Sequence, residues 1–193
     1  MVSSMINFIT GNKNKLAEAR AILEIIEIQG SLEDIARDKC QKAAIAVNGP
    51  VLTEDSALEF RALKGLPGPY IKWFYSALGN DGLCKLLAAY DDKAATAVCT
   101  FAFSAGPGSE PLLFQGHTEG KIVHKRGEGG FGMFSNRLLH VSRETKRNPS
   151  SGFDPIFEVE GQTYAEMSFE YKNMVSERFK ALGKLQNWQR NIV

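Results

Sequence analysis

Two neighbouring stretches in the middle of the chain constrain its fold most. Residues 97–103 are almost wholly apolar, which is typical of a central strand with both faces buried. Residues 112–123 instead alternate between two faces, with Phe114 and Ile122 on one and Glu119 and Lys121 on the other. This alternation predicts a long strand with one solvent-exposed face. Helical patterns precede and follow these strands. We therefore predict an α/β fold with a mixed sheet.

Shorter elements flank the two strands. Residues 6–9 predict a buried strand, and a polar turn then leads into residues 16–26, whose apolar positions recur at helical spacing. Ser31 and Asp34 have the spacing of a capping box, at the start of a helix that Gly49-Pro50 ends. The other predicted elements are a short strand at 51–53 that ends in Glu54-Asp55-Ser56, helices at 70–78 and 80–87, and a final helix marked by Val175, Phe179, Leu182 and Leu185.

Composition narrows the class of protein. A chain of 193 residues with 44% hydrophobic residues predicts one domain spanning 1–193. The net charge of +1 argues against binding to a nucleic-acid polymer, which requires a broad basic surface. Three cysteines without metal spacing indicate buried thiols in a reducing compartment. No apolar stretch reaches about 18 residues and no signal peptide is evident, so no membrane partner and a cytoplasmic location are expected.

The first turn carries a candidate phosphate site. Residues Thr10, Gly11, Asn12, Lys13, Asn14 and Lys15 lie between the first predicted strand and helix. Backbone N–H groups at such a turn, with the positive end of the helix and a lysine one turn on, are suited to holding phosphate. The GK[ST] ending of a Walker loop is absent. An ordinary polar turn is the alternative.

Acids and lysines elsewhere suggest a metal and a polyphosphate. Glu27 and the pair Glu54-Asp55 come from separate elements, and carboxylates so placed could hold Mg²⁺, with Mn²⁺ as an alternative ion. A solvated surface is the competing interpretation of the acids. The lysines of interest are Lys39, Lys72 and Lys172. For Lys72, which lies in an aromatic helix, extension of the amine into water is the alternative to contact with an anion.

Five motifs are distinctive when taken together. They are Thr10-Gly11-Asn12 with Lys15, Glu54-Asp55-Ser56, the block from Gly65 to Phe74 (GLPGPYIKWF), Phe153-Asp154-Pro155-Ile156-Phe157 and the block from Gln162 to Met167. This set resembles the inosine triphosphate pyrophosphatase family, whose members remove non-standard purine nucleotides. The resemblance covers nearly the whole chain, and the eukaryotic branch of the family is the most similar.

This resemblance implies a long central mixed sheet with flanking helices, two lobes around a cleft, a homodimer and purine nucleoside triphosphates as substrates. It implies hydrolysis of ITP, dITP and XTP to the monophosphate and pyrophosphate. Asp55 is similar to the residue that activates water in the family, and Glu27 and Asp55 are implied as ligands of Mg²⁺. Asp154, Ser176 and Arg178 are implied at the base end. The full set of implied substrate-binding residues is Thr10, Gly11, Asn12, Lys13, Asn14, Lys15, Lys39, Asp55, Ser56, Lys72, Phe153, Asp154, Lys172, Glu177 and Arg178.

The sequence departs from the family pattern in three places. A strand of about a dozen residues that usually precedes Glu27 is missing. An inserted basic loop, residues 133–152, separates Phe131-Gly132 from Asp154, and Phe153 stands where the family has tryptophan. Glu177 replaces a histidine that can donate to a 6-oxo group, whereas a carboxylate accepts. The alternatives are a Maf-like pyrophosphatase with another base preference and a catalytically impaired nucleotide-binding variant.

Overall fold

The computed structural model describes residues 7–9, 28–127 and 152–191. The predicted phosphate turn at 10–15, the helix at 16–26, Glu27 and nearly all of the inserted loop lie outside the described residues. The helices are α2 (Leu32–Val47), α3 (Ile71–Leu86), α4 (Phe169–Val175) and α5 (Glu177–Arg190), with a 3₁₀ turn η1 (Arg61–Leu63). The strands are β1 (Asn7–Ile9), β2 (Val51–Phe60), β3 (Pro67–Gly68), β4 (Ala94–Ser104), β5 (Leu112–Ile122), β6 (Phe157–Val159) and β7 (Gln162–Thr163).

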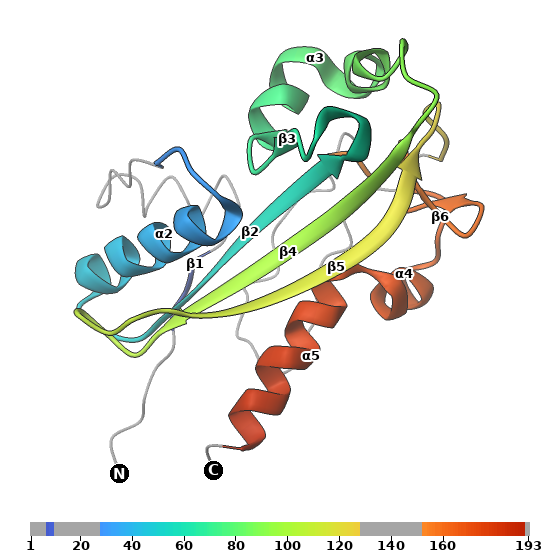
Figure 1. Ribbon diagram of the computed structural model, residues 1–193. Coiled ribbons are helices and arrows are strands. Elements are labelled where there is room, and N and C mark those ends of the chain that lie inside the picture. Colours follow the sequence, from blue (N-terminus) through green and yellow to red (C-terminus); the bar gives the residue numbers. More distant parts are fainter. Residues whose placement is uncertain (1–6, 10–27, 128–151, 192–193) are drawn as a thin grey trace. The chain divides into compact units, whose positions relative to one another are not determined.

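The strands form one mixed sheet, as predicted. Its order is β1-β2-β4-β5-β6-β7, and β3 pairs with β2 off this path. Strand β1 runs parallel to β2, with Asn7 opposite Val51, whereas β5 and β6 pair antiparallel. Figure 1 shows β2, β4 and β5 as the long strands. The α/β prediction and the two long strands in the middle of the chain are therefore confirmed.

The chain divides into two compact units. The first takes its residues from 1–57, 97–118 and 176–193, and the second from 58–96 and 119–175. The boundaries fall within β2, β4 and β5, so each of these strands contributes to both units.

Two helices cover opposite faces of the strands in the first unit. Helix α2 buries Ala36, Cys40, Ala43 and Ala44 against Val51 and Ala102. Helix α5 buries Ala181 and Leu185 against Leu52, Cys99, Phe101 and Phe114. Because successive side chains of a strand point to opposite faces, odd-numbered β2 residues face α2 and even-numbered ones face α5.

Helix α2 begins at the predicted cap. Ser31 is extended, and its hydroxyl accepts a hydrogen bond of 3.1 Å from the backbone N–H of Asp34. The same hydroxyl donates to the Asp34 carboxylate at 2.7 Å. The other end closes at Asn48, whose left-handed backbone lets its N–H reach the last carbonyls.

Removing this cap is expected to destabilise the chain modestly. Ser31→Ala leaves the N–H of Asp34 without its acceptor, and we expect a loss of about 1 kcal/mol in the free energy of unfolding, measured by urea denaturation. Ser31→Asn, which keeps a capping oxygen, serves as the control and should stay within about 0.5 kcal/mol of the parent chain. Equal stability of the alanine and parent chains would show that the cap contributes nothing.

Two boundaries differ from the sequence prediction. The strand expected at 51–53 continues to Phe60, since Ala57, Leu58 and Phe60 are buried. The final helix begins after Ser176, and Val175 belongs to α4. Phe179, one of the residues that mark the predicted final helix, is half exposed. The predicted break at Gly79 is confirmed, because this glycine has non-helical angles (φ 63°, ψ −176°) and two helical segments of α3 meet there.

None of the helices in the described part of the chain combines the length and the hydropathy needed to cross a bilayer.

Candidate active site

The acidic motif lies inside strand β2. The prediction that Glu54-Asp55-Ser56 follows the end of a strand is wrong, because the chain stays extended through these residues. Extension places Asp55 on the face that α2 covers and Glu54 and Ser56 on the face that α5 covers. All three side chains are partly buried, and each acid contacts a cation from a different helix. We call Lys39, Glu54, Asp55, Ser56 and Arg178 the β2 cluster.

On the α2 face, Lys39 holds Asp55. The lysine ammonium donates to Asp55 Oδ1 at 2.5 Å and to the backbone carbonyl of Glu54 at 3.3 Å. The Lys39 side chain is 16% exposed and that of Asp55 is 21% exposed, so water screens this pair only in part. Two predicted site residues, distant in sequence, therefore lie in direct contact, with the carboxylate oriented by the amine.

On the α5 face, Arg178 holds Glu54. Arg178 Nε and Nη2 both donate to Glu54 Oε1, at 2.8 and 2.5 Å, and Nη2 also lies 3.5 Å from the Ser56 hydroxyl. Burial would lower the pKa of the Arg178 guanidinium, but the charge of Glu54 opposes this, and the pKa is raised above its ordinary value. Arg178 therefore stays a cation, and it is fixed beside the acidic motif.

Glu177 lies next to this pair in the first turn of α5. It is 5% exposed, and its charge contributes to raising the pKa values of Cys99 and Arg178. A negative charge at this position interacts favourably with the positive end of the helix. Glu177, which stands where the family pattern has a histidine, is thus a buried acid.

The second unit contains another lysine–aspartate pair. Lys172 donates to Asp154 Oδ2 at 2.5 Å, and its ammonium lies 4.9 Å from the centre of the Tyr164 ring. Asp154 is buried, and its carbonyl accepts a hydrogen bond from the N–H of Ala165. Phe153 is half-buried and packs edge-on against Phe157 at 6.0 Å. Three predicted site residues, Phe153, Asp154 and Lys172, therefore gather in one place.

The remaining predicted lysine is exposed. Lys72 lies in the first turn of α3, where its ammonium is 5.3 Å from the centre of the Trp73 ring. Its side chain is exposed, so the amine is open to solvent. Its role in binding phosphate stays a prediction.

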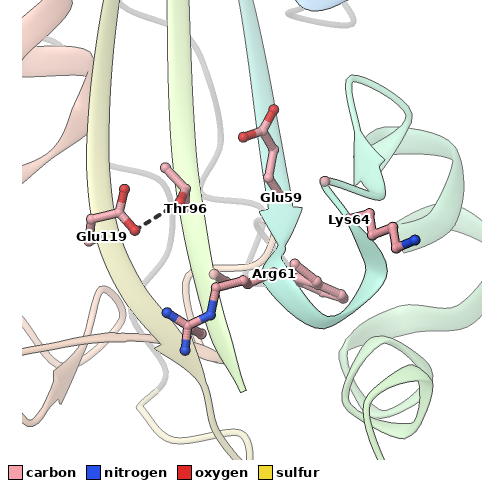
Figure 2. A pocket seen from close by; sticks show the side chains of 9 residues that line it. Glu59, Arg61, Lys64, Thr96 and Glu119 are labelled. Atoms are coloured by element: carbon pink, nitrogen blue, oxygen red, sulfur yellow. Dashed lines mark hydrogen bonds between the residues drawn. The ribbon is translucent and has the colours of Figure 1, made fainter. Parts of the chain in front are cut away.

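A hollow of about 300 Å³ in the second unit is lined by none of the predicted site residues. Figure 2 shows Glu59, Arg61, Lys64, Thr96 and Glu119 among the side chains that line it, and the Thr96 hydroxyl donates a hydrogen bond of 2.9 Å to Glu119. The Arg61 guanidinium donates two hydrogen bonds to Asp92, at 2.6 and 2.9 Å, which lower the pKa of that carboxyl. Arg61 and Glu119 thus already have partners within the protein.

The thiols near the β2 cluster are unreactive. Burial raises the pKa of Cys40 to about 11, against a smaller opposing effect from its hydrogen bond with Thr53. Burial also raises the pKa of Cys99 well above its ordinary value. Because the thiolate is the nucleophile, neither residue suits covalent catalysis. All three cysteines are free, and the prediction of buried thiols is confirmed for Cys40 and Cys99 but not for Cys84, which is half-buried.

The sequence alone does not show what two residues of these clusters do. It marks Glu54 only as a possible metal ligand, although Glu54 binds Arg178. It marks Tyr164 only as part of a family motif, although the Tyr164 ring packs against the Lys172 ammonium. The apolar residues Ala57, Leu58 and Phe60 were the available signal for Glu54, because they extend the strand and so place neighbouring acids on opposite faces.

Comparison with known proteins places these residues in context. A model of the Ham1 family matches residues 6–188. The chain is 57% identical to the inosine triphosphate pyrophosphatase of Ajellomyces capsulatus, over 95% of both chains. It also resembles the solved Ham1 protein of Staphylococcus aureus (28% identity, TM-score 0.74, 97% of this chain and 99% of that one). A Ham1 protein of Coxiella burnetii matches with 26% identity and a TM-score of 0.76, covering 96% and 98%. The resemblance predicted from the motifs is confirmed.

Proposed function

This chain belongs to the Ham1 family, and on that premise we propose that it hydrolyses ITP, dITP and XTP to the nucleoside monophosphate and pyrophosphate. The observation that carries the proposal is the 57% identity with an inosine triphosphate pyrophosphatase across 95% of each chain. The Lys39–Asp55 pair supports it, because it supplies an oriented carboxylate beside a cation.

Asp55 is proposed as the general base. A water oxygen attacks the α-phosphorus of the substrate, its proton passes to the Asp55 carboxylate, and the bond from the α-phosphorus to the bridging oxygen breaks to release pyrophosphate. A positioned base of this kind typically contributes 10²–10⁴-fold to a rate. Lys39 orients the base by its 2.5 Å contact with Oδ1, and so keeps the second oxygen in a defined direction.

The other site residues are proposed to bind the two ends of the nucleotide. Lys72 and Lys172, with the turn at 10–15, would neutralise the charge of the triphosphate. Phe153 offers a half-buried ring for stacking on the purine. Asp154, Ser56, Glu177 and Arg178 would contribute polar contacts to substrate.

Mg²⁺ is the proposed cofactor. Asp55 has the hard oxygen donors that this ion prefers, and Glu27 is its proposed second ligand. Mg²⁺ typically keeps several waters and binds through one or two carboxylates, so two acids are enough for such a site. When bound, the ion would stabilise the negative charge that develops on pyrophosphate.

Removing the metal tests the reaction and the cofactor together. We expect pyrophosphate release from ITP in millimolar Mg²⁺, and a fall of about 100-fold or more when EDTA is added, reversed by excess Mg²⁺. ATP is the matched control nucleotide, and its turnover should be far slower than that of ITP. Undiminished hydrolysis in EDTA would remove the metal from the proposal.

The buried acid Glu177 favours one second candidate, a pyrophosphatase of different base preference. A carboxylate accepts hydrogen bonds, so it does not replace a donor to a 6-oxo group. Faster turnover of dTTP or of a methylated GTP than of ITP would reverse the order of the two candidates. A homodimer and a cytoplasmic location are further proposals, which rest on the family resemblance.

A further inference from the structure

Strand β2 is held from both faces at adjacent residues. Asp55 meets Lys39 of α2, and Glu54 meets Arg178 of α5. The two acids share one peptide unit, so a displacement of either side chain is transmitted to the other. This arrangement suggests that the two ion pairs act together.

The pair on the α5 face is the better fixed of the two. Both guanidinium bonds go to one oxygen of Glu54, and the two side chains are only 13% and 16% exposed. Arg178 is the second residue of α5, and Ser176 caps that helix by accepting the N–H of Phe179 at 3.3 Å. The helix in turn lies directly on β5 at Gly116. Arg178 is therefore an anchor with little freedom to follow a moving strand.

We propose that Glu54 is a positioning residue: its ion pair with Arg178 fixes the segment of β2 that presents Asp55 to Lys39. The inference rests on the proposed function of Asp55. Because the Glu54 carboxylate is engaged by Arg178, Glu54 acts through the backbone of β2 and through Arg178. A displacement of about 1 Å at a reacting group can cost about 100-fold in rate.

The experiment compares three variants of the full chain by ITP hydrolysis and by hydrogen exchange. Glu54→Gln removes the charge but keeps an acceptor, and Glu54→Asp keeps the charge but withdraws it by one methylene. The matched control is Glu110→Gln, which breaks an exposed ion pair with Arg37 in the same unit. The readouts are kcat, KM for ITP, and the exchange rates of the amides of residues 53–56.

For Glu54→Gln we expect kcat to fall about 10- to 100-fold, with KM within about twofold of the parent value. The amides of 53–56 should exchange about tenfold faster. Glu54→Asp should lie between the parent and Glu54→Gln in kcat, and Glu110→Gln should match the parent in every readout. If Glu54→Gln fails to fold, Glu54→Asp alone decides the question by the same readouts.

Three results would overturn the inference. A rise in KM at constant kcat for Glu54→Gln would place Glu54 in substrate binding. An unchanged kcat in the folded variant would show that Glu54 has a structural role only. Unchanged exchange rates of the amides of 53–56 would show that Glu54 does not fix this segment of β2. A parent chain that releases no pyrophosphate would refute the proposed function instead. The exchange measurement would then still decide whether Glu54 fixes the strand.

Discussion

Replacing Asp55 with asparagine is expected to lower kcat for ITP hydrolysis by about 1,000-fold while the chain stays folded. The amide keeps the shape of the side chain and an oxygen to accept from Lys39, so the 2.5 Å contact is weakened rather than removed. It cannot take a proton from water, and it is a poorer ligand for Mg²⁺. The measurement is kcat from pyrophosphate release at saturating ITP and Mg²⁺, with circular dichroism to confirm folding.

Asp38→Asn is the matched control for this variant. Asp38 also pairs with a lysine, Lys42, at 2.7 Å, but the pair is of the i,i+4 type along α2. Such i,i+4 pairs within one helix contribute only a few tenths of a kcal/mol, so kcat should stay within about twofold of the parent value. If Asp55→Asn kept a tenth or more of the parent kcat, Asp55 would not be the general base, and the search would move to another acid.

Local patterns were sufficient for much of the fold. The apolar run at 97–103 corresponds to β4, and the alternation at 112–123 corresponds to β5. A strand buried on both faces is continuously apolar and one buried on a single face alternates, so both can be predicted from the sequence. The start of α2 at Ser31 was equally predictable, since the capping hydroxyl and the N–H that donates to it lie three residues apart.

Strand β2 was truncated in the prediction for a physical reason. Three consecutive polar residues, Glu54 to Ser56, resemble the end of a strand when their partners are unknown. Those partners are Lys39, which is 16 residues before Asp55, and Arg178, which is 124 residues after Glu54. Long-range ion pairs compensate the cost of placing the acids in a sheet, and no periodicity reveals them.

The candidate site, like the fold, could be predicted from the sequence only in part. The residue types were recognised, and the structure brings Lys39 to Asp55 and Lys172 to Asp154. Each of these lysines was predicted only as a partner for phosphate, yet each has a carboxylate partner within the protein. The sequence shows which side chains carry charge. The partner of each charge depends on tertiary contacts, which cannot be predicted from the pattern of a single sequence.

Gly116 is the position at which a single methyl group is expected to destabilise the fold most. It lies in β5 on the face covered by α5, and a Cβ atom there would stand 1.9 Å from the carbonyl oxygen of Glu177 and 2.6 Å from the nitrogen of Ala181. Both atoms belong to the helix backbone, so no side-chain rotation relieves the contact. Gly116→Ala must therefore push α5 away from the sheet, at a cost of about 3 kcal/mol in the free energy of unfolding.

Gly183→Ala separates this effect from the general consequence of adding a methyl group. Gly183 lies within α5 itself, and a Cβ there meets no atom within 4 Å, so alanine should stabilise the helix by about 0.5–1 kcal/mol. Urea denaturation of both variants should thus give changes of opposite sign. Helix α5 also carries Arg178, so Gly116→Ala should lower kcat even where the chain remains folded. Parent-like stability for Gly116→Ala would mean that α5 does not lie as close to β5 as the structure places it.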